Sequence, residues 1–314
     1  MKVVITPRGF ANCGEENVKY FQAAGIELDY NQTGKAYTKE EFYSLTADAD
    51  GVIVGVETVD RAYIDSHPAL KAVVKFGVGL DNIDVDYCRE KGIFVGKTAG
   101  SNARSVAETA ISFILADSKN LYESFDSTKT GGWAKLTGYE IEGKTVGIVG
   151  FGAIGKKVAQ MAYGLGMQVL AFDPYGVDKA FAEKFDVTAV TMEEILSQSD
   201  FVSLHLPLTE ETRDMISLPQ LKAMKSQAVL INTARGGIVN EKDLYTALSE
   251  KLIRAAYFDV FTSEPPQKDE PLLTLPNFYL TPHIASRSAE AEQKTAAMAT
   301  QIIIEALKGV YPDE

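Results

Sequence analysis

Gly150, Gly152 and Gly155 constrain the fold of this chain more than any other feature. They follow an apolar segment at 145–149 and precede a helical pattern at 154–165. In such a motif the first glycine permits a tight turn, the second lets a pyrophosphate approach the backbone, and the third lets the helix pack on the sheet. Backbone N–H groups at the start of the helix then bind the diphosphate. We expect a dinucleotide-binding strand–turn–helix unit here, the alternative being a glycine-rich turn without a ligand.

Asp173 strengthens the expectation of a dinucleotide site. It ends the next expected strand, at 168–172, about 20 residues beyond the glycines, where an acid accepts hydrogen bonds from ribose hydroxyls. A carboxylate at this point repels a 2′-phosphate, so the sequence favours NAD over NADP. The alternative is a turn aspartate in front of Pro174.

The alternation of short apolar runs with amphipathic stretches predicts an α/β protein of 314 residues with two lobes. Residues 121–139 are expected to be polar and irregular. Strands are expected at 3–5, 26–30, 51–56, 72–76, 93–95, 145–149, 168–172, 201–204, 228–232, 255–259 and 278–280. Helices are expected at 15–24, 39–45, 85–90, 101–120, 154–165, 192–197, 218–224, 241–250 and 289–307.

The expected boundary between the lobes lies near 99–101, and the last helix is expected to return to the first lobe. Residues 1–99 plus about 287–314 would then form a discontinuous substrate-binding domain, and residues 100–286 a continuous Rossmann domain. Both would be Rossmann-like or flavodoxin-like parallel-sheet domains. Two crossings near one place predict a hinge with a cleft between the lobes.

Composition excludes several classes of function. A net charge of -12 disfavours binding to nucleic acid and requires a local positive site for any anionic substrate. Cys13 and Cys88 form neither a disulfide framework nor a metal motif, which favours a reducing cytoplasm. The apolar run at the start is too short for a signal peptide, and no apolar stretch reaches the roughly 20 residues of a membrane helix.

Three residues downstream of the glycines carry candidate chemistry. Arg235 follows an apolar strand, where its planar guanidinium can bind a carboxylate through two hydrogen bonds, although an isolated arginine is usually solvated. Of the three histidines, His67 is expected in a helix-end turn and His205 in a structural or cofactor-adjacent place. His283 follows an expected strand, and the loop acid Glu264 could reach its imidazole. No metal-binding pattern is present.

A guanidinium, an imidazole and a carboxylate beside a dinucleotide site indicate hydride transfer to or from a small oxo or hydroxy acid. Six segments carry a resemblance to a known family: 76–84, 102–108, 143–150, 205–209, 232–236 and 282–286. Over nearly its whole length the chain resembles the D-isomer-specific 2-hydroxyacid dehydrogenases. This group contains D-3-phosphoglycerate dehydrogenase, glyoxylate/hydroxypyruvate reductase and D-lactate dehydrogenase.

The resemblance implies a homodimer with NAD in the central lobe and the substrate in the cleft. It also implies the cofactor contacts: Ala153 and Ile154 at the pyrophosphate, Asp173 at the ribose, Leu206, Pro207 and Thr212 on the adenosine side, and Thr233, Ala234 and Asp259 at the nicotinamide end.

For the substrate, the resemblance implies that the backbone of Val78 and Gly79 joins Arg235 in binding the carboxylate. His283 would transfer the proton and Glu264 would raise the pKa of its imidazole. Lys75 matches a position where phosphoglycerate dehydrogenases carry a basic residue for phosphate, and Lys135 could assist, whereas Glu57 would repel phosphate.

The substrate therefore stays open at this point. 3-Phosphoglycerate is favoured over glyoxylate, hydroxypyruvate or a D-lactate-type acid. A rival from another class is an NAD(H)-sensing, corepressor-like interaction protein, because such proteins share the fold and the three residues. Turnover of 2-hydroxy and 2-oxo acids separates the two classes.

Overall fold

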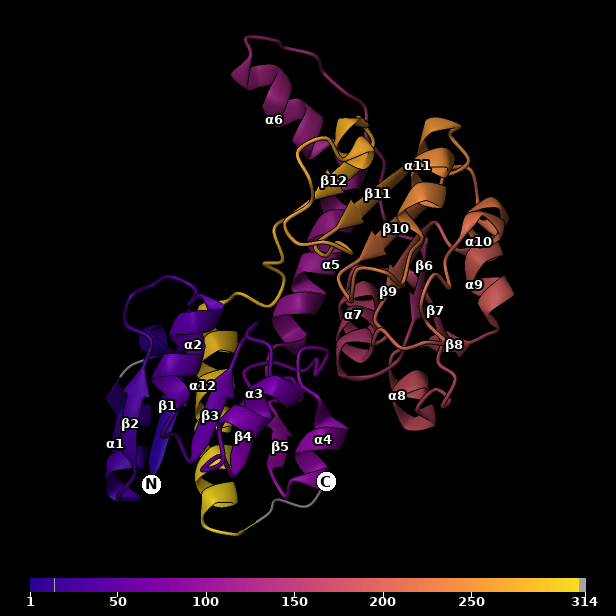
Figure 1. Ribbon diagram of the computed structural model, residues 1–314. Helices are drawn as coiled ribbons and strands as arrows, with labels where there is room; N and C mark the ends of the chain where they lie inside the picture. The colour runs from indigo at the N-terminus through magenta and orange to yellow at the C-terminus, as the bar shows by residue number, and fades with distance from the viewer. Residues whose placement is uncertain (14, 311–314) are drawn as a thin grey trace. The chain divides into compact units, whose positions relative to one another are not determined.

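The chain consists of two α/β units, each built on a parallel sheet (Figure 1). We describe them from a computed structural model, in which residues 1–13 and 15–310 are described. Unit 1 comprises Met1–Asn102 and Ser286–Glu314, and unit 2 comprises Ala103–Ala285. The predicted fold class of two parallel-sheet α/β domains is confirmed.

Unit 1 contains a five-stranded sheet in which every strand pair is parallel. Its order is β2-β1-β3-β4-β5, with bounds Glu27–Tyr30, Lys2–Ile5, Gly51–Val54, Ala72–Lys75 and Phe94–Lys97. All four residues of β3 are buried, because helices cover both faces of the sheet.

Two sets of helices cover the two faces of this sheet. Alternate strand residues such as Val4 and Val52 pack with α2 (Lys39–Thr46), α3 (Arg61–Ser66) and α4 (Val85–Glu90). On the other face, Val3, Ile5 and Ile53 pack with α1 (Glu15–Ala23) and α12 (Ala289–Leu307). The last helix thus completes the core of unit 1, as Figure 1 shows in yellow against the indigo strands.

Unit 2 contains a seven-stranded parallel sheet with helices on both faces. The strand order is β12-β11-β10-β9-β6-β7-β8, with bounds Phe278–Leu280, Ala255–Phe258, Val229–Asn232, Phe201–Leu204, Thr145–Val149, Gln168–Phe172 and Val187–Ala189. Helices α5 (Ala103–Ser118) and α7 (Ala153–Gly164) pack on one face; α9 (Met192–Gln198), α10 (Leu218–Ala223) and α11 (Glu241–Ser249) pack on the other.

The strand order of unit 2 reverses between β9 and β6, which marks a topological switch point. In open parallel sheets, ligands bind at such a point, outside the carboxyl ends of the strands. The segments after five strands meet at this edge. They begin at Gly150 after β6, His205 after β9, Thr233 after β10, Asp259 after β11 and Thr281 after β12. The fold therefore gathers the candidate residues of unit 2 at one edge.

Two stretches of unit 2 differ from the prediction. The expected irregular segment 121–139 begins with helix α6 (Leu121–Lys129), which starts after Asn120 turns the chain in the left-handed region and has no buried residue. Its residues are mostly polar and none is buried, so the segment was predicted as irregular. Helix α8 (Lys179–Lys184) and strand β8 were not predicted either, because both are short and stand at the edge of the sheet.

Candidate active site

The glycine loop after β6 has the shape that a bound diphosphate needs. Gly150 has φ +95°, and a side-chain Cβ there would lie 2.5 Å from the His205 carbonyl oxygen. A Cβ at Gly155 would collide with the Gly150 carbonyl oxygen. By contrast, nothing lies within 4 Å of the Cβ position at Gly152, the N-cap of α7. Gly150 and Gly155 are thus needed for close packing, whereas Gly152 leaves open space at the helix start that phosphate oxygens could occupy.

Asp173 directly after β7 is bonded to the glycine loop. Its Oδ2 accepts a hydrogen bond from Phe151 N at 2.6 Å, and its Oδ1 accepts one from Tyr175 N at 2.9 Å. A carboxylate has about four acceptor sites, so two remain for ribose hydroxyls. Asp173 therefore orders the loop and can still accept bonds from a cofactor, which is the role predicted for it.

The turn after β10 contains a buried hydroxyl that fits a ligand. Asn232 fixes this turn: its Oδ1 accepts from Ala234 N at 3.0 Å and its Nδ2 donates to Arg235 O at 2.9 Å. Thr233 is 6% exposed, and its Oγ1 has no hydrogen-bond partner among the described residues. A buried polar atom without a partner costs free energy, so a ligand group bonded to Thr233 would remove that cost. The nicotinamide end predicted here fits this observation.

Arg235 lies in the same turn, partly buried at the carboxyl end of β10. Its Nη1 donates to its neighbour's carbonyl, Ala234 O, at 2.7 Å. Gly236 then lets the turn pack tightly against the Phe261 backbone, where any Cβ would collide. The guanidinium is therefore bonded to the backbone of its own turn at this edge.

Asp259 forms the backbone turn that presents His283. The Asp259 carboxylate accepts hydrogen bonds from Thr281 Oγ1 at 2.5 Å and from the backbone N–H groups of Ile284 and Ala285 at 2.8 Å. These bonds support a left-handed backbone at His283, with φ +53°, which is uncommon for a residue other than glycine. The contact of Asp259 with the nicotinamide end, which the family resemblance implies, stays a prediction. Its bonding partners follow it by 22–26 residues, so no local pattern reveals this positioning role.

Glu264 and His283 form the hydrogen-bonded pair that the sequence predicted. His283 Nδ1 lies 2.7 Å from Glu264 Oε2, and Glu264 Oε1 accepts from Phe261 N at 2.9 Å. An ionised carboxylate can only accept, so Nδ1 carries the proton in this pair. The other ring nitrogen, Nε2, is then left to exchange a proton with a bound substrate.

The electrostatic environment favours the charged forms of both partners. The hydrogen bond to Glu264 raises the pKa of His283 above its ordinary value; burial and the charge of Arg235 oppose this, while the charges of Glu264 and Asp259 support it. Burial alone would raise the pKa of Glu264, but its bonds to His283 and Phe261 and the positive charges of His283 and Arg235 bring it below its ordinary value. His283 can therefore hold a proton near neutral pH.

The turn that follows β9 carries the residues predicted for the adenosine side. Thr212 Oγ1 donates to Pro207 O at 2.7 Å and accepts from Thr209 N at 2.7 Å, which closes the segment into a compact loop. Leu206 is 9% exposed beneath it. The cofactor contacts of Leu206, Pro207 and Thr212, like those of Ala153 and Ile154 at the start of α7, stay predictions.

The predicted substrate residues Lys75, Val78 and Gly79 belong to unit 1. Lys75 ends β4, and its Nζ donates to Gly55 O and to Asn82 Oδ1, both at 2.5 Å. These bonds show that Lys75 holds together the loops after β3 and β4. Val78, which is exposed, and Gly79, which is half-buried, follow β4. Their contact with substrate, and that of Lys75, stays a prediction.

Residues 1–13 and 15–310 contain neither a metal-binding cluster nor a membrane-spanning helix. No group of three or more His, Cys, Asp or Glu side chains in these ranges could hold a metal ion. No helix in them is both long enough and apolar enough to cross a membrane.

The glycine turn, the Asp173 carboxylate bonded to it and the switch-point sheet are the features of a dinucleotide-binding domain of the dehydrogenase class. Residues 111–285 match the family described as "D-isomer specific 2-hydroxyacid dehydrogenase, NAD binding domain". The chain belongs to this family, and the predicted NAD cofactor is confirmed by it.

Named relatives and a solved structure place the chain within the family. It is 41% identical over 287 residues to a D-3-phosphoglycerate dehydrogenase of Methanocaldococcus jannaschii, covering 90% of this chain but 54% of that protein. It is 37% identical to a glyoxylate reductase of Korarchaeum cryptofilum, covering 91% and 88%. A D-lactate dehydrogenase of Aquifex aeolicus, solved with NAD and lactic acid, has a TM-score of 0.82 at 27% identity, covering 99% and 96%. The chain thus spans about half the length of the first of these relatives.

Proposed function

We propose that this protein is an NAD-dependent oxidoreductase that interconverts small D-2-hydroxy acids and 2-oxo acids. The observation that carries the proposal is the 2.7 Å pair of His283 and Glu264, at the same sheet edge of an NAD-binding domain as Arg235. The names of the relatives, dehydrogenases and reductases of 2-hydroxy and 2-oxo acids, support the same conclusion.

In the direction of reduction, NADH held by unit 2 would supply a hydride to the carbonyl carbon. His283, protonated on both nitrogens, donates the Nε2 proton to the carbonyl oxygen as that oxygen becomes negative. Glu264 stays ionised, retains the Nδ1 proton in its hydrogen bond and stabilises the imidazolium before transfer. In the direction of oxidation, neutral His283 accepts the hydroxyl proton at the same nitrogen.

Arg235 binds and polarises the substrate in this proposal. Its guanidinium offers two parallel N–H donors to a carboxylate, and its positive charge stabilises the developing alkoxide. The backbone N–H groups of Val78 and Gly79 keep their predicted part as further donors to the carboxylate. The net charge of -12 makes this fixed positive group necessary, because the protein as a whole repels anions.

Candidate substrates follow from the named relatives. 3-Phosphoglycerate is the candidate suggested by the M. jannaschii relative, and glyoxylate and hydroxypyruvate are suggested by relatives called glyoxylate reductase and hydroxypyruvate reductase. A D-lactate-type acid is the further alternative.

A turnover panel tests the proposal. The purified protein is assayed with NADH and NADPH against glyoxylate, hydroxypyruvate, phosphohydroxypyruvate and pyruvate, and in reverse with NAD and the D-hydroxy acids. We expect turnover of at least one 2-oxo acid and preference for NADH, because the Asp173 carboxylate is predicted to bind the ribose hydroxyls and would repel a 2′-phosphate. NAD(H) binding without turnover of any acid would contradict the proposal and favour a sensing role.

We also propose a homodimer in the cytoplasm. Helix α6 and the segment after it expose Leu121, Phe125, Leu136 and Trp133, whose side chain is 80% exposed. Figure 1 shows α6 extending from the end of α5. Exposed apolar side chains in one segment suit contact with a second copy, and Cys13 and Cys88 are free thiols, as expected in a reducing compartment. Light scattering of the purified protein measures the oligomeric state directly.

A further inference from the structure

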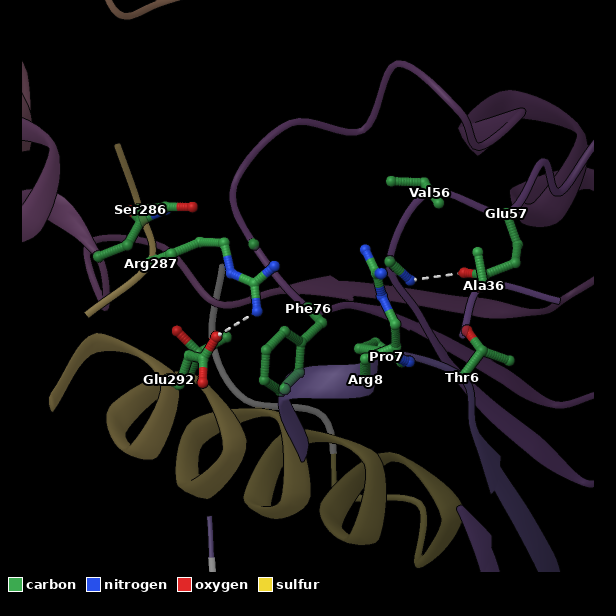
Figure 2. Close-up of a pocket in the computed structure, with 15 residues that line it drawn as sticks. Thr6, Pro7, Arg8, Ala36, Val56, Glu57, Phe76, Ser286, Arg287 and Glu292 are labelled. Carbon is green, nitrogen blue, oxygen red and sulfur yellow. Dashed lines mark hydrogen bonds and ion pairs between the residues drawn. The ribbon is translucent and has the colours of Figure 1, made fainter. Parts of the chain in front are cut away.

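Unit 1 contains a small cavity at the carboxyl ends of β1, β3 and β4 (Figure 2). Its volume is about 180 Å³, below the roughly 300–1,000 Å³ of pockets for drug-sized ligands. It therefore suits a group of a few atoms. The lining comes from the segments 6–9, 55–57 and 76–77, together with Ser286, Arg287 and other residues near the start of α12.

Two arginines lining this cavity keep unused hydrogen-bond donors. Arg8 is exposed and forms no hydrogen bond or ion pair with any residue in the described part of the chain. Arg287 donates from Nη2 to Glu292 Oε1 at 3.3 Å. Each guanidinium has five N–H donors in a planar fork, so most of the ten remain for a ligand. Figure 2 shows both side chains reaching into the cavity, on either side of the Phe76 ring.

The two acids in the lining are already bound by protein donors. Glu57 Oε2 accepts from Gly55 N at 2.9 Å. Glu292 accepts from Arg287 and, through Oε2, from Asn12 Nδ2 at 3.5 Å. Glu57 and Glu292 thus partly offset the positive charge of the two arginines, but neither accepts a hydrogen bond from Arg8. An anion with several acceptor oxygens fits this arrangement better than a cation or an apolar group.

The cavity lies close in sequence to residues that are predicted to bind the substrate or to transfer its proton. Gly77 lines the cavity and precedes Val78, one of the predicted carboxylate donors. Arg287 follows the proton-transferring His283 by four residues, which span at most about 14 Å of extended chain. The arginine side chain adds its own reach to this.

We propose that Arg8 and Arg287 bind a second acidic group of the substrate, a phosphate or a carboxylate, beyond the 2-oxo acid end. This inference rests on the proposed function and deepens it: the protein prefers 2-oxo acids with two anionic groups to glyoxylate or pyruvate. Sequence pattern alone reveals neither arginine, because Arg8 and Arg287 lie 279 positions apart and belong to none of the motifs that mark the site.

The experiment measures selectivity in Arg8→Gln, Arg287→Gln and the double variant. We compare kcat/KM for phosphohydroxypyruvate and for a 2-oxo dicarboxylic acid with kcat/KM for hydroxypyruvate, which separates phosphate from carboxylate as the second group. Loss of one charge-assisted hydrogen bond lowers affinity by about 10- to 100-fold. We expect the ratio of kcat/KM values for doubly charged over singly charged acids to fall by that factor in each single variant, mainly through KM, and to recover partly in Arg8→Lys.

Two control variants sharpen the result. Arg89→Gln removes an exposed arginine of unit 1 that pairs with Asp86 outside the cavity, and it should leave the ratio unchanged. Glu57→Gln removes a carboxylate from the lining and should raise the ratio. Thermal unfolding checks each variant; should Arg287→Gln unfold, Arg8→Gln decides alone, because Arg8 has no partner to lose within the described residues.

The outcomes separate this inference from the function on which it depends. Wild-type turnover of 2-oxo acids with no preference for doubly charged ones would overturn the inference and leave the proposed function intact. Arginine variants that keep the wild-type ratio would overturn the inference in the same way. Absence of turnover for every acid in the wild-type protein would instead overturn the proposed function.

Discussion

His283 and His205 both follow strands of the unit 2 sheet, yet their surroundings give them opposite properties. His283 is hydrogen-bonded through Nδ1 to Glu264, and this bond raises its pKa. His205 is bonded through Nε2 to Ser203 Oγ at 2.9 Å, while its Nδ1 is buried and has no partner among the described residues. Burial lowers the pKa of His205 to about 3.

The comparison shows that a carboxylate neighbour at one ring and burial of the other, not position on the sheet, decide which histidine can transfer a proton near neutral pH. Near neutral pH, His283 can bind and release a proton, whereas His205 stays neutral and inert. The backbone of His205 instead packs against the glycine loop: its N–H donates to Val149 O at 2.7 Å, and its carbonyl lies against Gly150. One histidine is thus a candidate catalytic residue and the other is a structural one.

The largest expected effect tests the catalytic side of this comparison. Replacing His283 with alanine removes the proton donor, so kcat should fall by about 10²–10⁴-fold, the usual contribution of general acid–base catalysis. NADH binding, measured by fluorescence titration, should be retained, because the glycine loop is unchanged. Wild-type turnover in His283→Ala would end the proposed role of this residue.

Arg235→Gln tests the positive charge that His283 faces and His205 lacks. Loss of the charged clamp should lower kcat/KM for every 2-oxo acid by about 10²-fold or more, since two charge-assisted hydrogen bonds are lost. The charge of Arg235 also holds the pKa of His283 down, so that pKa should rise further in the variant. An NMR titration of His283 together with steady-state kinetics checks both parts. A lower pKa, or an unchanged kcat/KM, would contradict the assignment.

Glu264→Gln makes the surroundings of His283 more like those of His205. The neutral amide removes the main cause of the raised pKa, so the pKa of His283 should fall. The rate of reduction should drop by about 10- to 100-fold at neutral pH, since a charge-assisted hydrogen bond is lost, and should decline at lower pH than in the wild type. The pH profile of kcat/KM gives the answer; a profile superimposable on the wild type would exclude Glu264 as the residue that tunes His283.

The smallest effect on activity is expected at His205 and is read from stability instead. As the pH falls from 6.5 toward about 3, the unfolded chain protonates this histidine but the folded protein does not. The free energy of unfolding should therefore fall by up to about 1.4 kcal/mol per pH unit in that window because of this group. His205→Gln should remove this part of the slope and keep kcat near the wild type. The measurement is urea unfolding between pH 4 and 7.

The contribution of His283 to the free energy of unfolding depends on pH in the opposite sense. Because its pKa is raised in the folded protein, its contribution to stability is complete below pH 6.5 and is lost as the pH rises through the folded pKa. A His205→Gln variant that loses stability with acid as steeply as the wild type would break the comparison between the two histidines.

Much of the fold could be predicted from local pattern. The apolar stripe of α12 has the helical period, and the short apolar runs at β3 and β6 are typical of buried parallel strands. Helix α6 is mostly polar and buries no residue, and it was missed. Motifs likewise pointed to Gly150, Asp173 and the pair of His283 and Glu264, because their chemistry depends on residue type at a strand end.

The amino-acid sequence by itself determined the class of the protein: glycines where only a residue without Cβ fits, and an arginine, an acid and a histidine after successive strands. Tertiary structure alone decided the rest. It bonded His283, but not His205, to a carboxylate, used Asp259 to shape a turn far along the chain, and placed Arg8 and Arg287 in one cavity. Hydrogen bonds and charges act over a few ångströms in space, and distance along the chain does not reveal which residues come that close.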